Sequence, residues 1–409
     1  MKIFNRYNTN WLTSFILITT QFHLLRNLTP LYYIFYAAAL AISCVFFVRW
    51  LPQSTRQARL FFWMVFLLIL YPIAPSIIGL AMGYYQSPDD SIFIGISRCI
   101  FVLPIYIAIL IQSENNRNQT QNIVGVIIFI SVIAALSIIL QFLIGPISWF
   151  AESSARSGLP RYASLFGSLT AFGLVNGPAI ILNYCFTRSK YLSSLFFVIL
   201  IAGSILSLQK AATVNMILAT FFMAWIKRPS LKELVSYLLF TLMGGVAVAM
   251  PFYQQMIGYL SSIRVFEGDG STTSDDFSIA ESIQDRIITL PSSAIDFHGS
   301  STLWLGLGPI GGSGAFGYPE IPMSHNGIVD LFLIGGIPYF LIFLTLCLCV
   351  SIVILKTTKK HTNFTSMIVG GFVVGIIVLN IPFSGLLFFT PSGALFLAAG
   401  LRLLCIRKS

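Results

Sequence analysis

The sequence has little charge. Only 9% of its 409 residues are Asp, Glu, Lys or Arg and 56% are hydrophobic, whereas a soluble domain is about 25% charged. So few charges cannot cover the water-facing surface of a chain this long, which excludes an ordinary soluble protein. The alternation of apolar and polar residues typical of a membrane β-barrel is also absent, so helices must satisfy the backbone within lipid. We therefore expect an all-α polytopic membrane protein.

Motifs for metal or nucleotide chemistry are missing as well. The sequence contains no His-Glu-x-x-His, Cys-x-x-Cys or Asp-x-Asp pattern and no P-loop. Its glycines at 306–308 and 311–314 allow tight turns and close backbone approach, but no strand–turn–helix context surrounds them. We therefore expect no metal and no cofactor. The net charge of +10 does not indicate nucleic acid, because the basic residues sit mainly in short connections between apolar runs.

Cysteine usage gives no sign of a disulfide framework. The six cysteines fall in or beside apolar segments, and none lies in the long polar stretch at 253–326. They are Cys44, Cys99, Cys185, Cys347, Cys349 and Cys405. The first apolar run has no small-residue cleavage site after it, so we expect a retained helix rather than a signal peptide.

Long apolar runs are what the sequence has in abundance. A membrane-crossing helix needs about 20 mainly apolar residues, and about twelve segments of the chain meet this requirement. Their predicted limits are 10–25, 31–48, 60–84, 92–111, 123–144, 165–186, 192–208, 211–226, 235–252, 327–355, 366–386 and 390–405. Nine of them lie in residues 1–252 and three in residues 327–409, on either side of one polar stretch.

That polar stretch, residues 253–326, is predicted to be one large external loop with short helices. It holds eight of the fourteen acidic residues. It ends in Ser324-His325-Asn326, where the next apolar run begins. A large polar loop that ends in a histidine at the membrane edge indicates chemistry at that membrane surface.

One helix of the loop is expected to carry an arginine. Ser278 and Glu281 fit a capping box and begin a helix that we expect to end at Pro291. One face of this helix is apolar, with Arg286 at its edge, so we expect it to turn Arg286 toward the mouth of the membrane domain. The apolar face consists of Ile279, Ile283, Ile287 and Leu290.

Positive charge predicts the orientation. Sixteen of the twenty-four basic residues fall in alternate short connections that share one side with both termini. Such residues stay mainly in the cytoplasm, so we expect both termini to be cytoplasmic and the long loop to be external. Arg402, near the inner end of the last span, is expected to snorkel to the cytoplasmic side. A miscounted span, which would flip the second half of the chain, is the alternative.

Several basic residues break that pattern. Arg98, Arg161, Lys210 and Arg286 would all lie at the outer side, where orientation does not require them. Arg98 also falls within the predicted fourth span, and a charge within a span suggests a function. Cations gathered at one membrane surface suit a phosphate or diphosphate. The alternative is that each one only anchors the chain at the interface. The other exceptions are Arg26, Arg156 and Arg264.

His325 is the candidate for proton transfer, because imidazole titrates close to neutral pH. It sits where the polar loop meets the next apolar run. Asn326 and Asp330 follow it four residues apart, and so share a helix face, where Asp330 can orient or charge-stabilise a neighbour. A structural histidine is the alternative. His298 and His23 are weaker candidates.

Three segments resemble the O-antigen ligase/polymerase superfamily of bacterial envelopes. Arg161 to Gly167 (RYASLFG) is similar to the family's arginine followed by Leu-Phe-Gly at the entry to a mid-chain span. Leu206 to Ala211 (LSLQKA) resembles its turn of small and basic residues, with Lys210 where arginine is usual. The third segment resembles the Gly-x-Gly, His-Asn and Gly block that closes the large loop. It comprises Gly306 and Gly308, then Ser324-His325-Asn326, then Gly335-Gly336.

The resemblance implies a metal-independent glycosyltransferase of lipopolysaccharide biosynthesis in the bacterial inner membrane, with its large loop in the periplasm. Its substrate would be an undecaprenyl-diphosphate-linked oligosaccharide. Its partners would be membrane lipid and a chain-length regulator. His325 and Arg286 would then be catalytic. Arg161 and Lys210, together with Arg98 on grounds of burial, would bind the diphosphate, and Asn326 and Asp330 would support the site.

The resemblance leaves the reaction open between two enzymes. A polymerase moves the growing chain from its lipid diphosphate to a new lipid-linked repeat unit, and we favour this activity. A ligase moves the finished chain to lipid A core. A flippase or transporter of lipid-linked oligosaccharide is the alternative from another class. It predicts charges deep in several spans and an inverted repeat, whereas Arg98 is the main in-span charge expected here.

Overall fold

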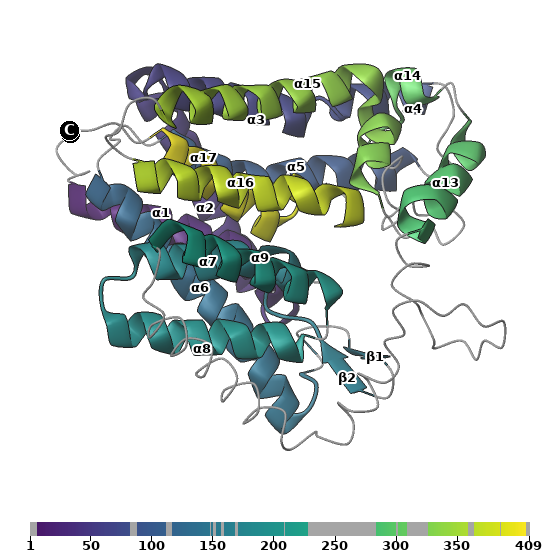
Figure 1. Cartoon of the computed structure of the whole chain (residues 1–409). Coiled ribbons are helices and arrows are strands. Elements are labelled where there is room, and N and C mark those ends of the chain that lie inside the picture. Colours follow the sequence, from purple (N-terminus) through teal and green to yellow (C-terminus); the bar gives the residue numbers. More distant parts are fainter. Residues whose placement is uncertain are drawn as a thin grey trace. The chain divides into compact units, whose positions relative to one another are not determined.

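The computed structural model describes the chain as a set of apolar helices with one small hairpin (Figure 1). The residues described are 6–81, 88–111, 117–147, 149, 153–156, 159–167, 171–207, 209–227, 284–299, 302–308, 326–358, 364–384 and 386–405. Four helical segments within them are long and apolar enough to cross a membrane, and six shorter apolar helices accompany them. The four are Leu31–Gln53, Arg56–Ile78, Gln119–Ile144 and Gly327–Lys356. The predicted class, a multi-pass helical membrane protein, agrees with these helices.

The helices group into two compact units. Unit 1 comprises Met1–Ala41 and Asn116–Ile279, and unit 2 comprises Ile42–Asn115 and Ala280–Ser409. The helix α2 (Leu31–Trp50) contributes its first half to unit 1 and its second half to unit 2. Unit 2 therefore takes helices from both sides of the predicted loop.

Unit 1 is built around the helix α7 (Ala171–Phe186), which is buried over most of its length. Its other described elements are α1 (Arg6–Gln21), the 3-10 helix η1 (His23–Asn27), α6 (Arg117–Ile144), β1 (Ser153–Arg156), β2 (Leu159–Tyr162), α8 (Lys190–Leu206) and α9 (Lys210–Lys227). Every residue of α7 from Ala171 to Asn183 is buried, because α6, α8 and α9 pack around it. Gly177 permits this packing, since a Cβ there would come within 2.7 Å of the Asn215 carbonyl oxygen on α9.

Unit 2 is built around α17 in the same way. Its described elements are η2 (Leu51–Gln53), α3 (Arg56–Leu70), α4 (Ile73–Ala81), α5 (Pro88–Leu110), the π-helix η4 (Asp285–Thr289), α13 (Leu290–His298), α14 (Thr302–Leu305), α15 (Gly327–Thr358), α16 (Phe364–Ser384), η6 (Leu387–Phe389) and α17 (Pro391–Leu404). All residues of α17 from Ser392 to Leu404 are buried, against α3, α5, α15 and α16. Close approach of Gly370 and Gly400 brings α16 and α17 together, as is usual for small residues between membrane helices.

The helices fall on the predicted apolar runs, with informative departures. The span expected at 60–84 is two helices, α3 and α4, because Pro72 cannot donate to the helix ladder. The span expected to begin at 165 begins at Ala171, and the strands Ser153–Arg156 and Leu159–Tyr162 before it pair as β1 and β2, which the sequence did not predict. The span expected at 235–252 lies outside the described residues.

Arg402 does not reach the surface of unit 2, as a snorkelling side chain would. It is only 1% exposed and is among the largest fully buried side chains. The reason is tertiary: neighbours cover α17 on every side, so a side chain on it has no route to the surface. The prediction of a snorkelling arginine was wrong, and unit 2 holds a buried cation instead.

The loop helix also differs from its prediction. Pro291 does not end it; the π-helix η4 leads into α13, and Pro291 lies in the first turn of α13, where the missing N–H is not needed. Because η4 is a π-helix, the spacing of an α-helical face does not apply to it. Ile287, expected to pack against the protein, is 50% exposed.

Candidate functional site

The helix α15 is broken just after its first turns. Gly336 has φ 66° and ψ −165°, a conformation open essentially to glycine alone. The break leaves the Ile334 carbonyl without its helical donor, because residue 338 is a proline with no N–H. The backbone N–H of Leu307 donates to Leu333 at 2.7 Å, and that of Gly308 donates to Ile334 at 2.8 Å. Figure 1 shows α15 turning beside α14, where these bonds form.

Four glycines make this junction possible, and we name Gly306, Gly308, Gly335 and Gly336 the glycine clamp. A Cβ on Gly306 would collide with the backbone of Gly335, and one on Gly336 would collide with the Trp304 carbonyl. Gly306 and Gly308 also have positive φ, 77° and 78°. The structure therefore brings together the two glycine segments that the sequence singled out, for a steric reason.

A second helix break lies against the first. Pro72, between α3 and α4, leaves the Leu68 carbonyl without its helical donor. The hydroxyl of Tyr339, just after the α15 break, donates to that carbonyl at 2.6 Å. The rings of Tyr71 and Tyr339 stack with their centroids 5.6 Å apart. A Cβ on Gly308 would also come within 2.8 Å of the Ser76 Cα on α4. The glycine clamp thus lies between two broken helices of unit 2.

Asn326 and Asp330 begin the first section of α15. The Asn326 side-chain oxygen accepts from the backbone N–H groups of Ile328 at 3.0 Å and Val329 at 3.5 Å, which is a helix N-cap. The Asp330 N–H donates to the Asn326 carbonyl at 2.9 Å. Both side chains are buried, Asp330 to 1% exposure. His325 immediately precedes this cap and lies outside the described residues.

The predicted cations of unit 2, Arg98 and Arg286, lie on α5 and η4. Arg98 is partly buried on α5, about 15 Å along the helix from its first residue. The next residue, Cys99, donates its thiol to the Ile69 carbonyl at 2.9 Å, so α5 is fixed against the end of α3. Arg286 lies on η4, which continues into α13; its side chain is outside the described part. Of the residues predicted for the site in unit 2, Asn326 and Asp330 contact each other in the described part of the chain.

In unit 1, the segment from Arg161 to Gly167 is held against α6. Arg161 lies on β2, opposite Ser154 of β1. Gln141 Nε2 donates to the Ala163 carbonyl at 2.8 Å, and the Leu165 N–H donates to Ser137 Oγ at 3.1 Å. Sequence reasoning missed Gln141 and Ser137. The available signal was two polar residues four apart in an apolar run, which places them on one helix face.

Lys210 lies at the same end of unit 1 as Arg161. It is the first residue of α9, and α8 ends at Leu206, so the tight turn expected there is present. Gln209 is buried against the first turn of α7, where a Cβ on Gly173 would collide with its side chain. The beginnings of α7 and α9 therefore lie side by side, directly after the Arg161 segment. The Lys210 side chain is outside the described part.

The predicted residues thus divide between the units: Arg161 and Lys210 in unit 1, and Arg98, Arg286, His325, Asn326 and Asp330 in unit 2. Within the described residues there is no cluster of His, Cys, Asp and Glu that could hold a metal ion. The chain matches no family model, no curated protein and no solved structure.

Proposed function

We propose that this protein is a glycosyltransferase that polymerises undecaprenyl-diphosphate-linked repeat units at the outer face of the bacterial inner membrane. The observation that supports this most is the glycine clamp. Gly308 is bonded to Ile334, and Asn326 caps the same section of α15. The residues on either side of 309–325, Gly308 and Asn326, are therefore both held by the first section of α15. This section also carries the buried carboxylate of Asp330. A histidine that precedes such a cap by one residue can be positioned for chemistry.

The reaction would be a single displacement at the donor sugar. The acceptor hydroxyl oxygen attacks the anomeric carbon, and the bond from that carbon to the diphosphate oxygen breaks. The hydroxyl proton passes to His325, while the bonding electron pair stays on the diphosphate of the lipid. Arg286 and the cations Arg161, Lys210 and Arg98 would stabilise that growing charge. In this proposal Asp330 orients the histidine, and Asn326 fixes the chain that carries it.

Chain growth by the purified protein would test the proposal. The full chain is reconstituted in liposomes with a labelled lipid-linked repeat unit and no other protein. A ladder of longer lipid-linked chains is expected, with release of undecaprenyl diphosphate in equal amount. Wild-type protein that leaves the repeat unit unchanged, after its insertion has been verified, would remove the proposal.

The ligase is separated from the polymerase by the products in a deletion strain. Loss of a polymerase leaves lipid A core with a single repeat unit, whereas loss of a ligase leaves core with none. A full ladder of chain lengths in the deletion strain would exclude both activities.

A transporter of lipid-linked oligosaccharide is favoured by one set of observations. Asp330 and Arg402 are buried within helices of unit 2, in addition to the partly buried Arg98, and α15 is a discontinuous helix. Charges inside a bundle and broken helices are typical of transporters. Movement of the repeat unit across the liposome membrane without any new glycosidic bond would support this second function.

A further inference from the structure

One end of unit 1 carries more basic residues than orientation explains. It is formed by three connections, at 22–30, 145–170 and 207–209, and we name it the cationic end. Asn27 Nδ2 donates to the Trp149 carbonyl at 3.3 Å, which joins the first connection to the second. The contact of Gln209 with Gly173 joins the third connection to the start of α7. Separate parts of the sequence therefore meet at this end.

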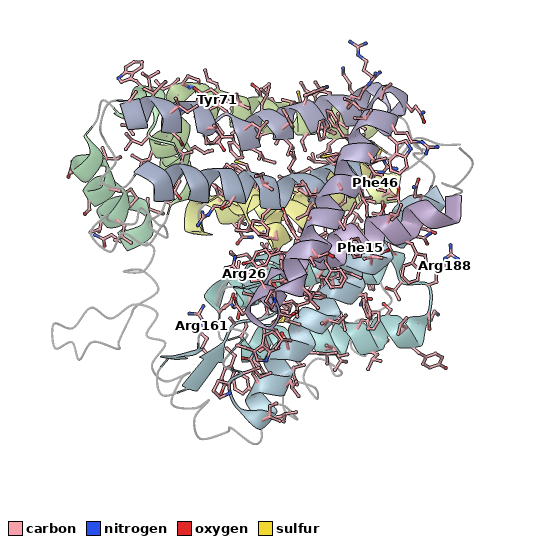
Figure 2. All side chains as sticks on the ribbon, turned by 180° about the vertical axis from the view of Figure 1, so that it is seen from behind. Phe15, Arg26, Phe46, Tyr71, Arg161 and Arg188 are labelled. Atoms are coloured by element: carbon pink, nitrogen blue, oxygen red, sulfur yellow. The ribbon has the colours of Figure 1, made fainter. Side chains whose placement is uncertain are left out.

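The charge of the cationic end is strongly positive. Its three connections and the first residue of α9 contain four basic residues and a single acidic one, Glu152. The basic residues are Arg26, Arg156, Arg161 and Lys210. A membrane protein keeps basic residues mainly on one side. Arg188 lies at the other end of unit 1, as Figure 2 shows. Membrane orientation therefore explains the basic residues at one end of unit 1 but not those at both ends.

Arg26 is an exposed cation of this end, and Arg161 is the other cation whose side chain the structure describes there. It lies in the last turn of η1, and its side chain is exposed, while the neighbouring Tyr32 is buried with its hydroxyl donating to the Thr19 carbonyl at 2.9 Å. Figure 2 shows Arg26 and Arg161 at the same end of unit 1.

We infer that Arg26 is a further phosphate-binding residue, acting with Arg161 on a phosphate or diphosphate ester of a lipid. A guanidinium group matches phosphate oxygens with two parallel N–H donors. A lipid phosphate lies at the level of a connection between membrane helices, which is where η1 lies. The identification of this ester as the lipid-linked substrate rests on the proposed function. Binding of a lipid phosphate by Arg26 and Arg161 does not itself require glycosyl transfer.

Lipid binding by the full chain in detergent tests this inference. Native mass spectrometry would follow titrations with undecaprenyl diphosphate, undecaprenyl phosphate and phosphatidylglycerol. Arg26→Gln should weaken binding of the diphosphate lipid about fivefold, the contribution of one arginine at a membrane surface. Arg26→Lys should retain most of the affinity. Arg188→Gln is the matched control at the other end, where Arg188 bonds Gln121 Oε1 at 2.8 Å, and should bind as the wild type does.

Comparison of the three lipids distinguishes the source of the phosphate. A loss confined to the two undecaprenyl lipids assigns Arg26 to the substrate. An equal loss for phosphatidylglycerol assigns it to phosphate headgroups in general, and both outcomes support a phosphate site. Wild-type affinity in Arg26→Gln for all three lipids, or an equal loss in Arg188→Gln, overturns the inference. Normal lipid binding without chain growth would remove the proposed function and leave this site in place.

Discussion

An acidic and a basic side chain are buried within the described helices of unit 2. Asp330 on α15 and Arg402 on α17 are each 1% exposed. A charge placed within a membrane bundle is costly and persists where it has partners or a function. The sequence assigned Asp330 a supporting role and treated Arg402 as an interface residue. Only packing could distinguish the two, because burial at each position depends on helices far away in the sequence.

Asp330→Asn should lower the rate of chain extension about a hundredfold, the usual contribution of acid–base assistance. The change keeps the shape of the side chain and removes its charge, so insertion and thermal stability should stay close to those of the wild type. The measurement is the initial rate of chain growth in liposomes from pH 5.5 to 8.5. A pH profile parallel to that of the wild type would show that Asp330 does not act through His325.

His325→Ala and Arg286→Ala should each abolish chain extension, because one removes the proton acceptor and the other removes a cation at the leaving group. Membrane insertion should be unchanged. His298→Ala, at the end of α13, is the matched control and should retain activity. Chain length is read from glycan ladders of complemented cells. Near-normal ladders from both variants would eliminate the proposed mechanism.

At the scale of elements, unit 2 depends on two discontinuous helices whose free carbonyl groups accept hydrogen bonds from other segments of the unit. The break in α15 is closed by Leu307 and Gly308, and the break between α3 and α4 is closed by Tyr339. Irregular backbone within a membrane is tolerated where it is buried in protein. The glycines and prolines at these breaks were visible in the sequence, but their pairing was not, because the partners are hundreds of residues apart for Tyr339 and Leu68.

Gly336→Ala should destabilise the protein by at least about 2 kcal/mol, because a Cβ makes this backbone conformation strained and collides with the Trp304 carbonyl. Gly375→Ala, in the interior of α16, is the control, since nothing lies within 4 Å of its added Cβ. Thermal unfolding in detergent should show a lower midpoint for Gly336→Ala and an unchanged or slightly higher one for Gly375→Ala. Equal midpoints would contradict a constraint at the clamp.

Tyr339→Phe should lower the free energy of unfolding by about 1 kcal/mol, because the Leu68 carbonyl loses its donor within the bundle. Tyr106→Phe is a close comparison, since Tyr106 is also fully buried and its hydroxyl donates to the Phe388 carbonyl over a longer distance, 3.2 Å. Tyr339→Phe should be the more destabilising change in chemical unfolding. The reverse order would argue against a role for Tyr339 in joining the two breaks.

At the scale of the whole molecule, the candidate residues are distributed over both packing units. Arg161 and Lys210 belong to unit 1, and Asp330 with the glycine clamp belongs to unit 2. Orientation in the membrane is therefore the first property of the whole chain to establish. It decides whether these residues face the compartment in which lipid-linked glycans are assembled.

Reporter fusions test that orientation. Alkaline phosphatase inserted after Gly270 should be active, because the predicted loop is periplasmic and the enzyme folds only there. Green fluorescent protein fused after Ser409 should fluoresce, because the predicted C-terminus is cytoplasmic. A phosphatase fusion after Lys190, in a predicted cytoplasmic connection, is the control and should be inactive. The opposite pattern for Gly270 and Ser409 would mean that the second half of the chain is flipped.

The sequence predicted the helices well and the environment of individual residues less well. Hydrophobic length alone located α2, α6 and α15, because spanning a bilayer requires a fixed run of apolar residues. It did not separate α3 from α4 or place Arg161 on a strand. It also gave no reason to notice Gln141 on α6. The side chain of Gln141 donates to the carbonyl of Ala163, which directly follows β2. Such features depend on where polar groups find partners after the chain has packed.

By itself, the sequence determined the class of protein. Low charge and repeated apolar runs leave a helical membrane protein as the solution, since the backbone must satisfy itself in lipid. Tertiary structure decided which residues are inside it. Arg402 is buried because α17 is surrounded, and Gly306 faces Gly335 because two chain segments meet at a broken helix. Contacts between distant segments depend on packing geometry, which hydropathy along the chain does not record.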